Sequence, residues 1–304
     1  MYDFNIFLQQ LSKGLTMGSI YALIALGYTM VYGVMKLINF AHGELFTLGA
    51  YFGYTALMTF GLAGRLGPPL AIGLSMVMVL GLVGLAGHIL ERVAYRPLRH
   101  SDRLAAVVSA LGASIFLQNA IMLNWGAQYR AYGTDLLPNL IFHFRGFNLP
   151  LVRLLVFVIA IVVMAILHVF IHKTRTGLAI RASAIDQGAA KLMGIDVRKV
   201  IALVFIIGPA LGGLAGLLVG LYYGQIDYSM GQLYGLKAFT AAIIGGIGNV
   251  TGAMVGGLLL GLLEAMGEGY VSGAWKDALT FLVLIMILVV RPTGLLPERV
   301  AEKL

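Results

Sequence analysis

Long apolar segments separated by short polar ones make up most of the chain. About 20 consecutive apolar residues in a helix, at ~1.5 Å per residue, cover the ~30 Å hydrocarbon core of a bilayer. The clear apolar segments run over residues 11–34, 40–60, 69–90, 104–124, 151–171, 200–222 and 276–290. Each of them predicts a membrane-spanning helix.

The stretch 228–269 has no long polar break. As one helix it would be about 60 Å long, twice the hydrocarbon core, so it must turn. The glycine-rich sequence GGIGN at 245–249 favours a turn there. The pattern therefore predicts an all-α polytopic membrane protein with nine transmembrane helices, within a range of eight to ten. A re-entrant half-helix in 228–269 is the alternative.

Composition agrees with a polytopic membrane protein, and the distribution of charge predicts how the chain is oriented in the membrane. The mean hydropathy is +0.91, and the chain has no cysteine, which excludes disulfides and thiolate chemistry. Basic residues concentrate in two loops, 91–103 and 172–199, which the positive-inside rule places in the cytoplasm. The N-terminus is then outside. The basic tail (Arg291, Arg299, Lys303) is inside with nine spans and outside with eight.

The net charge of +8 is distributed in these loops and does not form a nucleic-acid-binding patch. The N-terminus has no basic n-region, and the apolar run Gly14–Val34 lacks an evident cleavage site, so we expect a retained span and not a signal peptide. Residues 1–304 are expected to form a single transmembrane domain.

Two segments far apart in the chain resemble each other. NFAHGELFTLGAY at 39–51 aligns without a gap to DYSMGQLYGLKAF at 227–239, which pairs Gly43 with Gly231 and Glu44 with Gln232. Five predicted spans separate the copies, so they enter the bilayer from opposite sides. This predicts an inverted-topology repeat with substrate passing where the copies face each other. Accidental similarity between helix starts is the alternative. The candidate pathway residues are Asn39, His42, Glu44, Asp227, Gln232 and Lys237.

Ionisable groups inside apolar runs are unfavourable against lipid, so we expect Glu44 and Lys237 to face the interior or water and to sense each other's charge. Alternatively, Glu44 lies near the headgroups and Lys237 snorkels. Small residues spaced four apart, such as Gly14 and Gly18, predict close helix packing. The longest such series is Gly208, Gly212, Gly216, Gly220 and Gly224.

The segment 173–199 is the most polar in the chain. Ala182, Ile185, Ala189 and Leu192/Met193 lie on one helical stripe, and Gly194 predicts the helix end. Such an amphipathic helix could rest on lipid headgroups. Its alanines and glycines favour docking into a protein groove, with the docking helix flanked by Asp186 and Gly194.

Several motifs resemble one family. The order AxxxDxxAAxxxGI from Ala182 to Ile195 resembles the coupling loop of ABC-importer permeases. NFAHGELFTLGAY, ERVAYRPLR at 91–99, SIFLQN at 114–119 and KAFTAAIIGGIGNVTGAMVGG at 237–257 resemble the branched-chain amino acid permeases of the LivH type. The resemblance implies contact with an ATPase subunit through the coupling loop. The residues it implicates are Arg181, Ala182, Asp186, Ala189, Ala190, Gly194 and Ile195.

The resemblance also implies partners: a LivM-type permease, two cytoplasmic ATPases, a periplasmic binding protein and the lipid of a bacterial inner membrane. It implies import of branched-chain amino acids, although the same family includes members for urea and short amides. The loop 125–150 carries no recognisable receptor-docking motif.

The chain has no GxxxxGK[ST] phosphate loop, HExxH metal motif or GxSxG nucleophile elbow. We therefore expect no cofactor on this chain, with ATP used by the partner subunits, and no enzymatic activity of its own. An ion-coupled carrier and, more remotely, an intramembrane enzyme are the alternative functions.

Overall fold

The computed structural model describes residues 2–98, 101–133, 140–144 and 147–296. Within these residues, seven helices are long and apolar enough to cross a membrane. These helices and their continuations run over Phe4–Met35, Pro68–Leu98, Leu104–Trp125, Leu151–Lys173, Val197–Tyr223, Val250–Tyr270 and Gly273–Val290. The polytopic all-α class predicted from the sequence is confirmed.

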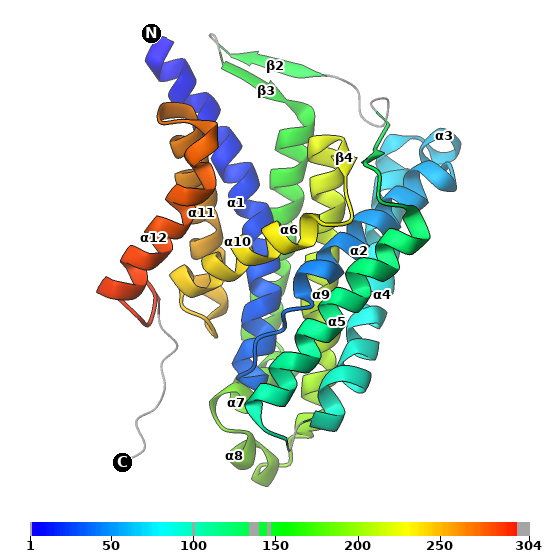
Figure 1. The fold of residues 1–304 in the computed structure, drawn as a ribbon, viewed down its shortest axis with the longest axis vertical. Coiled ribbons are helices and arrows are strands. Elements are labelled where there is room, and N and C mark those ends of the chain that lie inside the picture. Colours follow the sequence, from blue (N-terminus) through cyan, green and yellow to red (C-terminus); the bar gives the residue numbers. More distant parts are fainter. Residues whose placement is uncertain (1, 99–100, 134–139, 145–146, 297–304) are drawn as a thin grey trace.

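The α-helices are arranged as follows along the chain (Figure 1). They are α1 (Tyr2–Met35), α2 (His42–Tyr54), α3 (Leu62–Leu66), α4 (Pro68–Leu90), α5 (Arg103–Trp125), α6 (Leu151–Lys173), α7 (Arg175–Ile185), α8 (Gln187–Leu192), α9 (Val197–Tyr223), α10 (Met230–Gly245), α11 (Val250–Tyr270) and α12 (Lys276–Val290).

Two of the nine expected spans are shorter than a bilayer. Helix α2 has 13 residues, with a π-helical extension at Thr55–Thr59, and α10 has 16. At ~1.5 Å per residue the two α-helices are only about 20 and 24 Å long. Together with its π-helical extension, the helix over 42–59 nearly fills the segment expected at 40–60, whereas α10 begins at Met230 and is shorter than a full span. In Figure 1, α10 lies across the molecule at a steep angle to α1.

The turn predicted at 245–249 is confirmed. Helix α10 ends at Gly245 and α11 begins at Val250, and Gly246 and Gly248 have φ of 104° and 101°. Only glycine adopts such angles readily, so the GGIGN sequence reverses the chain here.

Helices α1 and α9 form the centre, and α1 is the most buried of the candidate spans (94%). A Cβ on Gly27 of α1 would lie 2.7 Å from the carbonyl oxygen of Gly208 on α9. A Cβ on Gly18 would lie 2.8 Å from Leu258 Cα on α11. The packing role predicted for the regularly spaced small residues is confirmed at these crossings. Gly224 differs from its series, since it ends α9 with φ 72° and open space around it.

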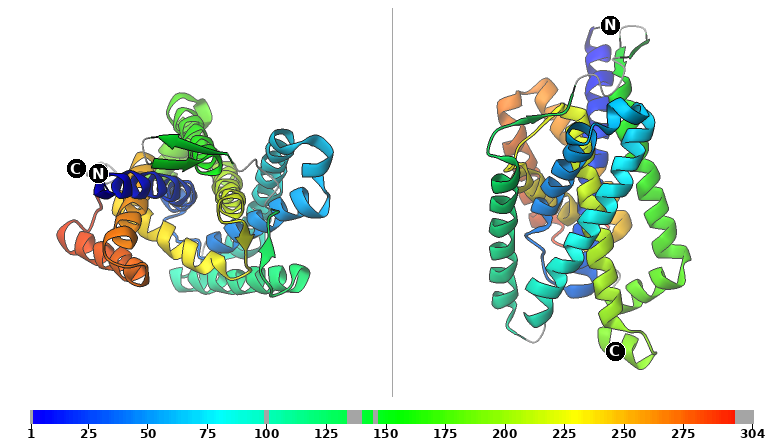
Figure 2. Two further views of the ribbon diagram at one scale, coloured as in Figure 1. Left: turned by 90° about the horizontal axis from the view of Figure 1, so that it is seen from above. Right: turned by 90° about the vertical axis from the view of Figure 1, so that its right-hand side faces the viewer.

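The helix contacts follow the repeat. When the alignment of the two copies is extended, α9 is the counterpart of α1, α10 of α2 and α11 of α4. Helix α1 packs on α11 as α9 packs on α4, and α2 packs on α10. Figure 2 shows α11 and α12 on one side of the molecule and α3 and α4 on the other. The counterparts Phe46 and Tyr234 stack with ring centroids 5.1 Å apart, as expected for residues near the axis that relates two inverted copies.

One end of the molecule, which the sequence predicts to face outside, carries strands that the sequence pattern did not predict. Strand β1 (Arg130–Ala131) pairs antiparallel with β4 (Gln225–Ile226), and β2 (Ile141–Phe144) with β3 (Phe147–Pro150). The β1–β4 pair joins the loop after α5 to the end of α9, whereas β2 and β3 pair locally within that loop. Analysis of period-2 alternation could not reveal such short strands.

The opposite end carries α7 and α8, at the bottom of Figure 1. Arg96 from the first basic loop and Arg198 and Lys199 from the second line one shallow pocket, so both loops lie at the same end, as predicted. The predicted positions of Arg99, Arg299 and Lys303 lie outside the described residues.

Candidate functional site

A groove of about 610 Å³ lies where α2 and α10 begin, beside α5. Its lining residues come from both copies of the repeat and from two neighbouring helices: Tyr28, Ile38, Phe40, Gly43, Glu44, Leu111, Ser114, Ser229, Gly231, Gln232, Leu233, Gly235, Leu236 and Phe239. Most of these side chains are apolar or small, with a few polar groups among them. This is the usual composition of a site for a small organic ligand.

Glu44 and Gln232, which align in the repeat, both line the groove. Glu44 is 1% exposed, and its Oε2 has no hydrogen-bond partner among the described residues. A buried carboxylate oxygen without a partner is unfavourable unless a ligand or water satisfies it. Glu44 therefore lies in the protein interior, as expected.

Three other candidate pathway residues do not line the groove. His42 lies in a glycine-lined notch between α1 and α9, where its ring contacts Tyr28 with centroids 4.5 Å apart. Asn39 is buried and accepts a 2.8 Å hydrogen bond from the Tyr95 hydroxyl. Asp227 accepts hydrogen bonds from the amide and hydroxyl of Ser229, within its own turn. These contacts fix the chain where α2 and α10 begin.

Lys237 is buried (3% exposed) but does not pair with Glu44. Its Nζ lies 2.6 Å from Glu264 Oε1 on α11 and 2.6 Å from Asp277 Oδ1 at the start of α12. The expected charge pair across the repeat is therefore wrong, and so is the snorkelling alternative. Two carboxylates on neighbouring helices neutralise the lysine inside the protein, as buried charges require.

The ion pairs continue through Lys276 and Glu268 to Lys13. Lys276 lies 3.1 Å from Glu264 and 3.8 Å from Glu268, and Lys13 of α1 lies 2.5 Å from Glu268. Three lysines and three acids thus connect α1, α10, α11 and α12 without net charge. Glu264 and Asp277 were not among the candidate site residues. The sequence offered one signal for them, which is that they lie near charged groups inside apolar runs. Which groups they pair with could be identified only from the tertiary structure.

The segment 173–199, predicted to be cytoplasmic, forms two helices and not one. The stripe predicted over 182–193 is interrupted at Asp186, whose extended backbone (φ −151°) ends α7. Its side chain accepts hydrogen bonds from the Gly188 and Ala189 amides and so caps α8. The prediction that Asp186 and Gly194 flank a short helix is confirmed.

Helix α8 ends in a Schellman motif. The Gly194 amide donates to the Lys191 carbonyl, the Ile195 amide donates to the Ala190 carbonyl, and Gly194 has φ 84°. The last residue of α8 and its C-cap residue are apolar and exposed: Leu192 is 91% and Met193 82% exposed. Adjacent exposed side chains of this size on a capped helix are typical of a docking surface.

The remaining coupling candidates divide between surface and interior. Ala189 is exposed and Ala182 and Ile195 are partly buried, while Ala190 is 4% exposed and packs inward. Arg181 lines a separate cavity under α7.

The start of α9 is fixed by a further cap outside the membrane. Asp196 accepts hydrogen bonds from the amides of Lys199 and Arg198. The Lys199 amide contributes most to holding the pKa of Asp196 below its usual value of 3.8.

Comparison with known proteins identifies the family to which the chain is similar. Residues 10–288 match the family model described as branched-chain amino acid transport system / permease component. The chain is 45% identical over 300 residues to the high-affinity branched-chain amino acid transport system permease protein BraD of Pseudomonas aeruginosa, which covers 98% of each chain. It is 42% identical over 309 residues to the permease protein LivH of Escherichia coli, which covers 99% of each.

More distant relatives match over part of the length. The fructose import permease protein FruG of Bifidobacterium longum is 27% identical over 44% of this chain and 42% of its own. No solved structure matches the chain. The relatives that match from end to end are permease components of transport systems, and the long apolar helices make this chain a multi-pass membrane protein. The chain belongs to the family of branched-chain amino acid transport system permease components.

Proposed function

We propose that this chain is one membrane-spanning subunit of an ATP-driven importer that carries branched-chain amino acids across the bacterial inner membrane. It assembles with a second permease of the LivM type, two cytoplasmic ATPases and a periplasmic binding protein. The energy source is external to this chain, because its own sequence has no phosphate-binding loop.

The observation that carries this proposal is the α8 docking tip, defined as Leu192 and Met193. Their exposed fractions of 91% and 82% would be unfavourable in a protein that works alone. Gln187, next to the α8 cap, donates a 2.6 Å hydrogen bond to the Val34 carbonyl at the end of α1. A force applied to α8 by an ATPase therefore reaches the central helix directly.

The groove supplies half of the substrate path. Its apolar residues suit an aliphatic side chain, the Glu44 carboxylate faces the ammonium group, and the Gln232 amide faces the carboxylate. The groove is open on one side, where Leu233 and Leu236 of α10 are 43% and 52% exposed. The second permease covers this side and completes the path.

Leucine uptake into proteoliposomes containing the whole importer tests the proposal. We expect ATP-dependent uptake with the intact chain. The variant Leu192→Ala/Met193→Ala should abolish uptake and release the ATPases during purification. The control Val289→Ala/Val290→Ala removes two similarly exposed residues from α12 and should keep both.

Uptake driven by an ion gradient without ATPases would contradict the proposal and favour the ion-coupled carrier. Uptake of urea, short amides or another amino acid in preference to leucine would retain the mechanism and change the substrate. The variant Glu44→Gln distinguishes an amino acid substrate from an amide substrate. It should weaken selection for an ammonium group and leave the uptake of amides unaffected.

A further inference from the structure

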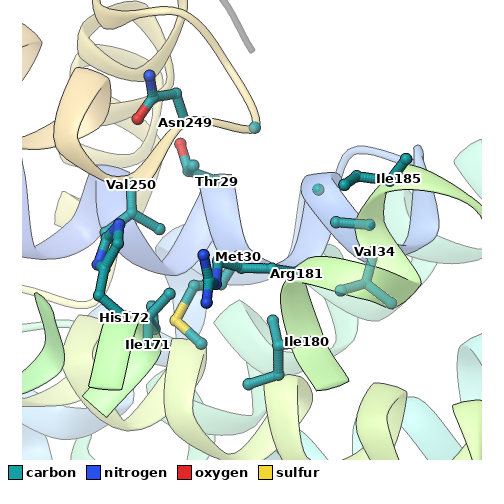
Figure 3. A pocket seen from close by; sticks show the side chains of 13 residues that line it. Thr29, Met30, Val34, Ile171, His172, Ile180, Arg181, Ile185, Asn249 and Val250 are labelled. Atoms are coloured by element: carbon teal, nitrogen blue, oxygen red, sulfur yellow. The ribbon is translucent and has the colours of Figure 1, made fainter. Parts of the chain in front are cut away.

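A second cavity of about 370 Å³ lies at the cytoplasmic end, away from the groove (Figure 3). It is a partly open space between α1, α6, α7 and the turn between α10 and α11. Its lining residues are Thr29, Met30, Gly33, Val34, Ile171, His172, Ile180, Arg181, Ala184, Ile185, Gly248, Asn249 and Val250. None of them lines the groove, so the two spaces are distinct.

The cavity has a cationic side. Arg181 extends into it from α7 toward Met30, as Figure 3 shows. Within the described residues Arg181 forms no ion pair, and no acidic side chain lines the cavity. The first turn of α11 begins at Val250 on the opposite side. The Asn249 side chain caps its Gly252 amide, and the positive end of the helix dipole there favours an anion.

A buried hydroxyl provides an independent indication of a ligand. Thr29 lines the cavity and is 0% exposed, yet its Oγ1 has no hydrogen-bond partner among the described residues. Asn249, at the start of α11, lines the same cavity (Figure 3). An unsatisfied buried hydroxyl is unfavourable, so a polar group of a ligand is the natural partner.

The rest of the lining is aliphatic. Met30, Val34, Ile171, Ile180 and Val250 provide a continuous apolar wall beside the guanidinium. The volume lies near the lower end of the range for small-molecule sites, about 300–1,000 Å³. Anionic lipid headgroups are usually held by clusters of about 4–8 Lys/Arg, whereas this cavity has one arginine.

We propose that this cavity binds a small aliphatic monocarboxylate from the cytoplasm, with the carboxylate between Arg181, the Thr29 hydroxyl and the start of α11. The aliphatic part lies against the α1, α6 and α7 side chains. Because no acidic residue faces the cavity among the described residues, an ammonium group is not required for binding. A bound ligand links α7 of the coupling segment to α1 and α11. The proposal rests on the proposed function only for the choice of leucine as one probe.

Equilibrium binding to the full chain in phosphatidylcholine nanodiscs tests the site, with radiolabelled 4-methylpentanoate as the main probe. We expect L-leucine to compete and leucinol, which lacks the carboxylate, not to compete. Arg181→Gln should weaken binding about tenfold or more, and Thr29→Val about fivefold. Thr29→Val keeps the side-chain volume and removes the unsatisfied hydroxyl, so its thermal unfolding should match or exceed that of the unmodified chain.

Two controls locate the binding. Arg175→Gln removes a cation from the same helix outside the cavity, and Gln232→Leu alters the groove; neither should change the affinity. The inference is overturned if Arg181→Gln binds normally, if only Gln232→Leu loses binding, or if the unmodified chain does not bind. Displacement by phosphatidylglycerol but not by leucine would also overturn it, in favour of a lipid headgroup. Failure of ATP-driven uptake with binding intact would contradict the proposed function alone.

Discussion

Gly43 and Gly231, which occupy the same position in the two copies of the repeat, lie backbone to backbone where α2 and α10 begin. A Cβ on Gly43 would lie 2.3 Å from the Gly231 carbonyl oxygen, and one on Gly231 would lie 2.5 Å from the Gly43 carbonyl oxygen. The two helix starts can meet at the groove only because neither residue has a side chain.

Alanine at either glycine should separate these helix starts. We expect Gly43→Ala and Gly231→Ala each to destabilise the protein by about 1–3 kcal/mol, because the added methyl meets backbone that cannot move aside. Thermal unfolding of the purified chain in detergent measures this. Gly112→Ala on α5, where the added methyl meets open space, is the matched control and should be neutral or slightly stabilising. Equal effects at Gly43 and Gly112 would contradict the close approach.

Removal of the Lys237 charge should be strongly destabilising. Lys237→Met leaves Glu264 buried with less compensation, and breaking a buried pair on one side typically costs about 3–5 kcal/mol. The double variant Lys237→Met/Glu264→Gln should recover part of the loss, whereas Lys237→Met/Glu44→Gln should give additive losses. Unfolding midpoints of these three variants and of the single variants Glu264→Gln and Glu44→Gln decide between the partners. If Glu44→Gln recovered the lost stability instead, Lys237 would be paired with Glu44 across the repeat and not with Glu264.

Membrane sidedness can be read from single cysteines, since the native chain has none. Met193→Cys should react with an impermeant maleimide only from the cytoplasm, and Val271→Cys, in the turn before α12, only from outside. Both positions are well exposed, at 82% and 65%. Arg291→Cys, directly after α12, tests the number of crossings. Labelling from the cytoplasm agrees with nine, and labelling from outside would favour eight.

Acid should loosen the start of α9. The folded-state pKa of Asp196 lies below its usual 3.8 because backbone amides, first that of Lys199, donate to the carboxylate. The stabilisation is therefore present above pH 3.8 and is lost as the pH falls through the folded-state value. Hydrogen exchange at the Arg198 and Lys199 amides, corrected for intrinsic rates, should accelerate across that range. Asp196→Asn keeps an oxygen acceptor that does not titrate, so its protection should not change in the same way.

Local patterns determined much of this protein. Apolar length predicted the long helices, since burying about 20 apolar residues in lipid requires a helix that satisfies its own backbone. Gly246 and Gly248 reverse the chain where the sequence predicted, because their positive φ values are accessible to glycine. Asp186 and Gly194 fixed the ends of α8 through hydrogen bonds within a few residues. The alignment of 39–51 with 227–239 identified the segments that meet at the groove.

The tertiary structure decided which of these groups meet. Lys237 pairs with Glu264 and Asp277 because α10 packs on α11 and α12, a choice that the repeat alignment with Glu44 did not contain. His42 turned away from the groove because Gly27 and Gly212 leave room for its ring between α1 and α9. Arg181 and Thr29 lie 152 positions apart and share a cavity only through the packing of α7 on α1. Apolar periodicity states which side chains avoid water, but partners within the membrane are set by close packing and by hydrogen-bond and charge satisfaction between distant segments.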